Sequence, residues 1–161
     1  MTTPGNTQTA YHPAIHGSFT VERTYNAPIE RVWAAFADPE VKRLWFDGPP
    51  EWDSEPYEGD IREGGREVSI GGPKGGPVSR YYGYIWEIVP HQRIVTTYEM
   101  YINDDRLSVS LLCTEFEPTP DGTRVTLTEH GTYLLGEDGT PDREHGYGQI
   151  LEMIAPIVEQ A

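Results

Sequence analysis

The sequence predicts an α+β domain in which six to seven antiparallel strands curve around one long C-terminal helix, with two short helices after the first strand. Turn signals rich in Gly, Pro and Asn divide the segment from 51 to 133 at strand-length intervals. Residues 147–158 carry apolar side chains at helical spacing. Because so many strands cannot bury an apolar face as a flat layer on one helix, the sheet must curl around it.

The first strand is predicted at 18–25, where apolar and polar side chains alternate. A short helix follows Pro28, because the first turn of a helix does not need the missing amide proton. Asp38 is the expected N-cap of a second short helix, with Pro39 at its first position. The Gly-Pro-Pro run at 48–50 ends that helix.

The long helix is predicted from about 142 to 158. Its apolar stripe is the strongest in the chain and consists of Tyr147, Ile150, Leu151, Ile154, Ala155 and Val158. Gly146 and Gly148 lower its intrinsic propensity by roughly 1 kcal/mol each relative to Ala. The helix therefore depends on packing against the sheet.

Alternation along each strand predicts which side chains face the helix. In the last strand, the inward set is Val125, Leu127 and Glu129. For the three preceding strands, the expected inward sets are Leu107, Val109, Leu111 and Cys113; Tyr82, Tyr84, Trp86 and Ile88; and Ile94, Thr96, Tyr98, Met100 and Ile102.

These assignments give the protein an aromatic interior. Such an interior is often simply a core, but several buried Tyr hydroxyls need partners and suit a cavity that holds water or a ligand. We therefore expect a ligand cavity between the sheet and the long helix. Its predicted lining residues are Trp45, Tyr57, Trp86, Tyr98, Met100, Leu111, Glu129 and Tyr147.

Glu129 stands out because it places a carboxyl group on an apolar face. If Glu129 borders an apolar cavity, burial should raise its pKa and allow it to donate a proton or a hydrogen bond to a ligand. Alternatively, it is a strand-end carboxylate paired with an Arg or a Tyr hydroxyl.

The length of 161 residues predicts one domain, from 18 to 161, preceded by a flexible tail at 1–17. A single cysteine, Cys113, excludes an intramolecular disulfide and favours a reducing compartment. No apolar run approaches the ~20 residues of a membrane span. The first ten residues lack the features of a signal peptide, so we expect a cytoplasmic protein.

The net charge is −14, from 26 acidic and 12 basic residues. Such a charge repels nucleic acid and anionic membranes, and it keeps the protein soluble. We expect no nucleic-acid partner, no metal and no cofactor. The expected partner is a small hydrophobic or amphipathic molecule, bound by a monomer or homodimer.

Several short segments recur in a familiar order: 26–33, 38–40 with 44–46, 60–66, 87–90 with 93–95, and 122–129. From residue 18 to about 155 the chain resembles the helix-grip fold of the START and birch-pollen-allergen (SRPBCC) superfamily. It looks most like the branch related to the C-terminal domain of the activator of the heat-shock-protein-90 ATPase. Two departures keep the physical role: Phe46 stands where the family often has a second Trp, and Glu63 where it often has Pro.

The resemblance implies three alternative functions. The first is binding of a small hydrophobic or amphipathic molecule in the cavity. The second is an enzyme of cyclase, dehydratase or hydrolase type that uses Tyr hydroxyls with Glu129 as acid or base. The third is a protein-interaction module, such as a chaperone cofactor. This branch shares a fold more than a chemistry, so no catalytic residue is carried over from it.

Overall fold

The computed structural model describes residues 11–160 and shows one seven-stranded antiparallel sheet in the order β1-β7-β6-β5-β4-β3-β2. The strands are β1 (Ile15–Tyr25), β2 (Asp53–Gly59), β3 (Arg66–Gly72), β4 (Ser79–Val89), β5 (Arg93–Ile102), β6 (Asp105–Thr119) and β7 (Gly122–Tyr133). The helices are α1 (Ile29–Ala37), α2 (Pro39–Phe46) and α3 (Thr140–Val158). The predicted fold class is thereby confirmed.

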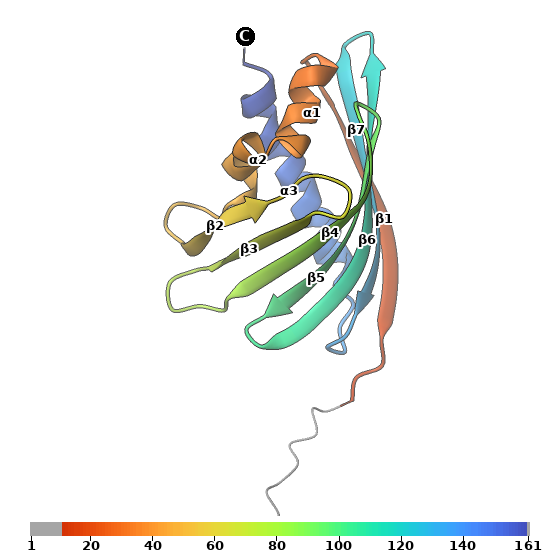
Figure 1. Ribbon diagram of the computed structural model, residues 1–161. Helices are drawn as coiled ribbons and strands as arrows, with labels where there is room; N and C mark the ends of the chain where they lie inside the picture. Colours follow the sequence, from red (N-terminus) through yellow and green to blue (C-terminus); the bar gives the residue numbers. More distant parts are fainter. Residues whose placement is uncertain (1–10, 161) are drawn as a thin grey trace, which may run out of the picture.

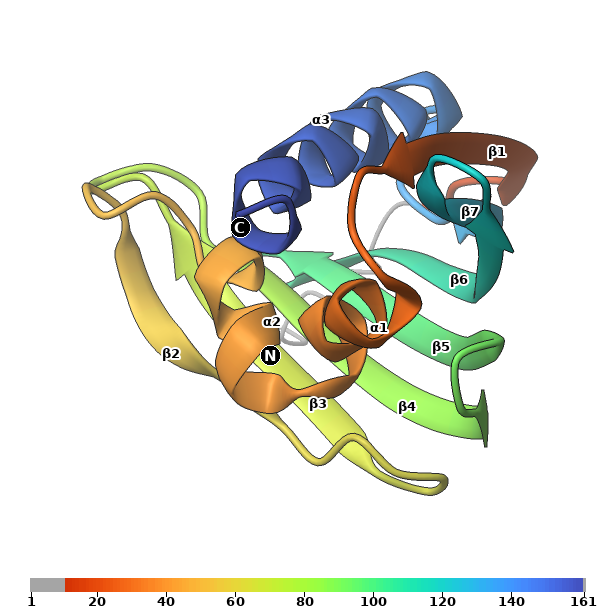
Figure 2. The ribbon, with the colours of Figure 1, turned by 90° about the horizontal axis from the view of Figure 1, so that it is seen from above.

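The sheet curves around α3, which runs along its concave side (Figure 1). The sheet stays open, and its two edge strands, β1 and β2, lie on opposite sides of the helix (Figure 2). Helices α1 and α2 cover the end of the concave side where α3 ends (Figure 1). The other end of the concave side is left to the first turns of α3.

The first strand starts earlier than predicted. Residues 15–17 pair with 131–133 of β7, so β1 begins at Ile15 rather than at residue 18. The predicted tail of residues 1–17 is therefore too long, because pairing with β7 extends the strand beyond its alternating sequence pattern. Residues 1–10 lie outside the described part of the chain.

The helix termini follow local hydrogen-bonding rules. Asp38 is the N-cap of α2 as predicted, since its Oδ1 accepts a hydrogen bond from the backbone N–H of Glu40 at 3.0 Å. At α3, Gly139 is the N-cap, and the stabilising carboxylate comes one residue earlier. Asp138 Oδ1 accepts from the N–H of Thr140 at 2.9 Å.

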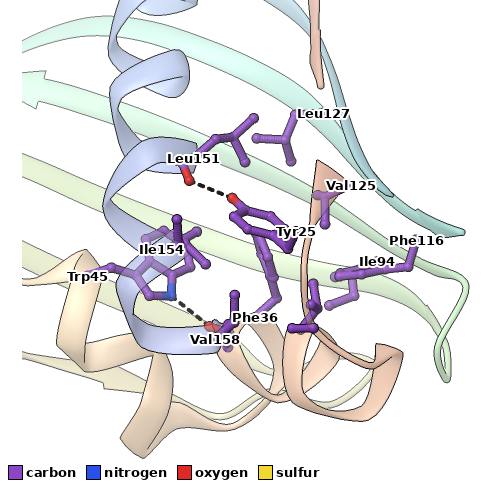
Figure 3. Close-up of a cluster of buried hydrophobic side chains, with 14 of the residues drawn as sticks. Tyr25, Phe36, Trp45, Ile94, Phe116, Val125, Leu127, Leu151, Ile154 and Val158 are labelled. Atoms are coloured by element: carbon purple, nitrogen blue, oxygen red, sulfur yellow. Dashed lines mark hydrogen bonds between the residues drawn. The ribbon is translucent and has the colours of Figure 1, made fainter. Parts of the chain in front are cut away.

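The core lies between α1, α2, the C-terminal half of α3 and the inner face of the sheet (Figure 3). Its buried aromatic side chains find partners for their polar atoms. The hydroxyl of Tyr25 donates to the backbone oxygen of Leu151 at 2.6 Å, and Trp45 Nε1 donates to that of Ala35 at 2.7 Å (Figure 3). Because these hydrogen bonds offset the desolvation of the hydroxyl and of the indole N–H, the burial of both rings stabilises the fold.

The inward face of β5 and β7 agrees with the prediction. Ile94, Thr96 and Tyr98 of β5 are buried, and so are Val125 and Leu127 of β7, together with Glu129.

The predicted inward set of β4 is wrong at three of its four positions. Tyr81, Gly83 and Ile85 face inward, and Trp86 is 59% exposed on the outer face. The pairing with β5 shifts register between Ile85 and Glu87. This bulge reverses the alternation, so Ile88 returns to the core as predicted.

The predicted inward set of β6 is wrong at Val109 and Leu111, although Leu107 lines the cavity as an inward residue. Val109 and Leu111 are 46% and 43% exposed, whereas Ser108 and Ser110 are buried. The two serines face inward because they accept hydrogen bonds from the guanidinium group of Arg143 on α3. A polar contact with a distant helix thus overrides the apolar pattern of the strand.

Candidate functional site

A cavity of about 510 Å³ lies between the first turns of α3, the inner face of the sheet and the end of α2. This volume lies within the range that is typical of small-molecule binding sites, roughly 300–1,000 Å³. Its walls are formed by Trp45, Phe46, Gly48, Trp52, Ser54, Ser69, Ile70, Gly71, Ser79, Tyr81, Tyr98, Met100, Leu107, Tyr133, Glu137, Asp138, Gly139, Asp142, Arg143, Gly146, Tyr147 and Ile150. The cavity therefore occupies the end of the concave side that α1 leaves uncovered.

The cavity wall is mostly apolar but contains one polar cluster. Tyr98, Arg143 and Tyr147 line the cavity, and the polar atoms of Arg143 and Tyr147 are both within hydrogen-bonding distance of the Tyr98 hydroxyl. Arg143 Nη1 donates to Tyr98 Oη at 2.7 Å, and Tyr147 Oη donates to the same oxygen at 3.0 Å. The hydroxyl of Tyr98 in turn donates to the carboxylate of Glu129, which is fully buried behind it.

Arg143 connects the first turns of α3 to three strands. Its guanidinium group lies 3.4 Å from Glu129 Oε2 and donates to Ser108 Oγ at 2.8 Å and to Ser110 Oγ at 3.3 Å. It also lies over the ring of Tyr133, with Cζ 5.4 Å from the centroid. With its side chain only 15% exposed, Arg143 holds the helix against the sheet at this end.

Burial raises the pKa of Glu129 above its ordinary value of 4.5, although the hydrogen bond from Tyr98 and the charge of Arg143 act in the opposite direction. This confirms the predicted direction. The two interpretations of Glu129, a buried acid with a raised pKa and a paired carboxylate, are therefore not exclusive. The carboxyl group is paired with Tyr98 and Arg143, and burial still disfavours its ionised form. Burial raises the pKa of Tyr98 and Tyr147 as well, so both hydroxyls keep their protons near neutral pH.

A second buried carboxylate, Glu67 on β3, lies beside the first cluster. Its Oε1 is 2.5 Å from Lys42 Nζ on α2, and it accepts a hydrogen bond from Tyr57 Oη at 2.5 Å. Burial opposes ionisation, but the charge of Lys42 and hydrogen bonds from Lys42, Tyr57 and Tyr81 hold the pKa of Glu67 below its ordinary value. Lys42 and Glu67 border a smaller cavity of about 40 Å³.

The eight predicted site residues fall into three groups. Trp45, Tyr98, Met100 and Tyr147 line the larger cavity. Glu129 is in contact with its wall through Tyr98, and Tyr57 is buried in the Glu67 cluster without lining that cavity. Trp86 and Leu111 lie on the outer face, and their placement in the site was wrong. A ligand-binding role for the lining residues stays a prediction.

Lys42, Arg143 and Glu67 belong to these clusters but were not predicted from the sequence. Lys42 is separated from Glu67 by 25 residues, and Arg143 from Glu129 by 14, so no local spacing indicates either pair. The position of Arg143 on the apolar side of α3 was the one available signal, since it stands four residues before Tyr147.

Within residues 11–160, no group of three or more His, Cys, Asp or Glu side chains is arranged to hold a metal ion. In the same part of the chain, no helix combines the length and the apolar character needed to cross a membrane.

A curved antiparallel sheet that grips a long C-terminal helix, with a cavity between them, defines a protein of the helix-grip class. The model of one family of this class, described as "Activator of Hsp90 ATPase homolog 1-like protein", matches residues 26–159. The chain belongs to this family.

Solved structures agree with this assignment. An uncharacterised protein from Rhizobium leguminosarum is 34% identical with a TM-score of 0.86, over 92% of this chain and 98% of the other. The Mll3558 protein from Rhizobium loti is 42% identical with a TM-score of 0.83, over 91% and 99%. Protein CV1439 from Chromobacterium violaceum shares the fold at 24% identity and a TM-score of 0.71, over 89% and 99%. A comparison with curated proteins finds no match.

Proposed function

We propose that this protein binds a small hydrophobic or amphipathic molecule in the cavity between α3 and the sheet. The observation that carries the proposal is the cavity itself: about 510 Å³ of space with a largely apolar wall and one cluster of hydrogen-bonding groups. This combination is typical of sites that bind small molecules.

The two parts of the wall suit the two parts of such a molecule. Trp45, Met100 and Ile150 offer apolar surface to a hydrophobic body. Each Å² of apolar surface that the ligand removes from water contributes roughly 25 cal/mol. The polar cluster of Tyr98, Arg143 and Tyr147 offers hydrogen-bonding atoms to a polar group of the ligand, which would otherwise lose its contacts with water.

Two glycines on α3 provide a matched test. Gly146 lines the cavity and Gly148 does not, and at both positions an added Cβ meets no atom within 4 Å. Gly146→Leu therefore places a side chain at the cavity wall, while Gly148→Leu adds the same side chain elsewhere on the helix. Both substitutions also remove a glycine from a helix, which favours folding by roughly 1 kcal/mol relative to Gly.

The experiment is native mass spectrometry of the purified proteins after expression in cells. We expect a retained small molecule on the wild type and on Gly148→Leu, and a clear loss of it on Gly146→Leu. Equal retention by all three proteins would place the ligand elsewhere. A wild type that retains nothing, and that also takes up no hydrophobic probe, would reject the proposal.

A second candidate is acid–base catalysis in the same cavity, of the cyclase, dehydratase or hydrolase type. It is supported by the raised pKa of Glu129 and by the hydrogen bond that connects this carboxyl group to the cavity through Tyr98. Under this alternative, a retained molecule would be converted chemically by the wild type. Glu129→Gln would still bind it but would leave it unchanged. Under the binding function, both proteins would release the molecule intact.

A further inference from the structure

The hydrogen bonds on the cavity wall have a fixed direction. An ionised carboxylate accepts hydrogen bonds and donates none, so the single proton of the Tyr98 hydroxyl points to Glu129. The oxygen of Tyr98 then accepts from Arg143 Nη1 at 2.7 Å and from Tyr147 Oη at 3.0 Å. The proton of Tyr147 is thereby committed to Tyr98.

Tyr147 lines the cavity, and its hydroxyl is hydrogen-bonded to that of a second lining residue, Tyr98. With its proton donated to Tyr98, this oxygen keeps lone pairs but has no proton to offer to a ligand. While Glu129 is ionised, the Tyr147 hydroxyl is therefore a hydrogen-bond acceptor toward the cavity.

We propose that the ligand of this cavity presents a hydrogen-bond donor, a hydroxyl or an N–H group, to Tyr147 Oη, and that Glu129 sets this preference through Tyr98. The inference rests on the proposed function, because it specifies the chemistry of a ligand for the same cavity. Tyr147 is a specificity-determining residue in this arrangement. Glu129 is a positioning residue, since it orients the hydroxyl of Tyr98 without lining the cavity itself.

Protonation of Glu129 reverses the direction of the hydrogen bonds. The neutral carboxyl group donates to Tyr98, Tyr98 donates to Tyr147, and Tyr147 then has a proton for the cavity. The ionisable groups that face Glu129 are Arg143 and Tyr147 on α3, Tyr98 on β5 and Tyr133 on β7. Its paired neighbours on β1 and β6, Phe19 and Leu112, carry no ionisable group. In acid, Tyr147 should thus donate a hydrogen bond to molecules that have only an acceptor.

Two probes of nearly equal shape separate these cases: 1-naphthol, which donates and accepts, and 1-methoxynaphthalene, which only accepts. We expect the wild type at neutral pH to bind 1-naphthol roughly threefold to tenfold more tightly, the equivalent of one net hydrogen bond. Tyr147→Phe keeps the ring and should bind both probes equally. Tyr82→Phe is the matched control, because Tyr82 is half-exposed and does not line the cavity, and it should keep the preference.

The pH dependence gives an independent measurement on the wild type. As the pH falls through the folded-state pKa of Glu129, binding of 1-methoxynaphthalene should strengthen and the ratio of the two affinities should approach one. In Tyr147→Phe the ratio should not change with pH. Because this measurement needs no variant, it also decides the matter if Tyr147→Phe fails to fold.

The binding measurements distinguish a failure of this inference from a failure of the proposed function. If both probes bind the wild type equally at neutral pH, or if the ratio is independent of pH, the inference is overturned while the cavity remains a binding site. If neither probe binds, the proposed function is overturned and the inference with it.

Discussion

Tyr81 stacks on Tyr98, with ring centroids 4.8 Å apart and an interplanar angle of 29°. This contact connects the clusters around the two buried carboxylates, since Tyr81 donates a hydrogen bond to Glu67 and Tyr98 donates one to Glu129. Their pKa values nevertheless move in opposite directions, down for Glu67 and up for Glu129. Lys42 Nζ lies 2.5 Å from Glu67, whereas Arg143 lies 3.4 Å from Glu129 and shares its donors with Tyr98 and the serines of β6.

Glu67→Gln should destabilise the protein at pH 7 by about 3–5 kcal/mol, because it leaves the nearly buried Lys42 without its counter-charge. A lowered folded-state pKa contributes stability above the ordinary value of 4.5 that is lost as the pH falls through the folded value. The variant and the wild type should thus converge in acid. Denaturant unfolding at pH 7 and in acid measures both effects, and a pH-independent difference would contradict the lowered pKa.

Glu129→Gln should change the stability in the opposite direction from Glu67→Gln. Because the folded-state pKa of Glu129 is raised, its contribution to stability is fully present below 4.5 and is lost as the pH rises through the folded value. Because burial disfavours the ionised form of Glu129, replacement by a neutral amide should stabilise the protein near pH 7. Thermal melts at pH 7 and pH 4 test this. A variant that is less stable at pH 7 but equal at pH 4 would show that pairing outweighs burial.

Leu151→Ala should cost about 2–5 kcal/mol of unfolding free energy, because Leu151 is 2% exposed at the contact between α3 and the core. Met153→Ala is the matched control on the same helix. Met153 is 50% exposed, and its truncation should change stability by about 0.5 kcal/mol or less. Urea unfolding of both variants gives the comparison, and a small effect at Leu151 would mean that α3 is not docked as described.

Two adjacent leucines test the alternation along β6. Leu112 packs against the core, whereas Leu111 is 43% exposed on the outer face. Leu112→Ala should cost about 2 kcal/mol or more, and Leu111→Ala under about 1 kcal/mol. The reverse order in unfolding experiments would restore the inward assignment that the apolar pattern predicts.

The fold could be predicted from the sequence because its signals are local. The Asp38-Pro39 helix start, the turn residues between strands and the apolar stripe of α3 each depend on a few neighbouring residues. The inward faces of β5 and β7 followed for the same reason, since alternation in these strands runs unbroken from Ile94 to Tyr98 and from Val125 to Glu129.

The candidate site was predicted only in part, because its polar contacts join distant parts of the chain. The aromatic residues Tyr98 and Tyr147 were found because burial of aromatics is a strong prior. Arg143 and Lys42 were missed, since a charged residue on a predicted helix is ordinarily assigned to solvent. Their counter-ions, Glu129 and Glu67, lie on strands that come close to those helices only when the sheet curls.

The sequence by itself determined the order of strands and helices, the long apolar face of α3 and the inward position of Glu129, because these depend on local spacing and propensity. The tertiary structure decided which face of β4 and β6 points inward. In β4 a bulge after Ile85 reverses the alternation, and in β6 the buried guanidinium of Arg143 draws Ser108 and Ser110 inward and leaves Leu111 outside. The physical reason in β6 is that a buried charge must be satisfied by hydrogen bonds. This requirement outweighs the preference of the exposed side chains of Val109 and Leu111 for an apolar environment.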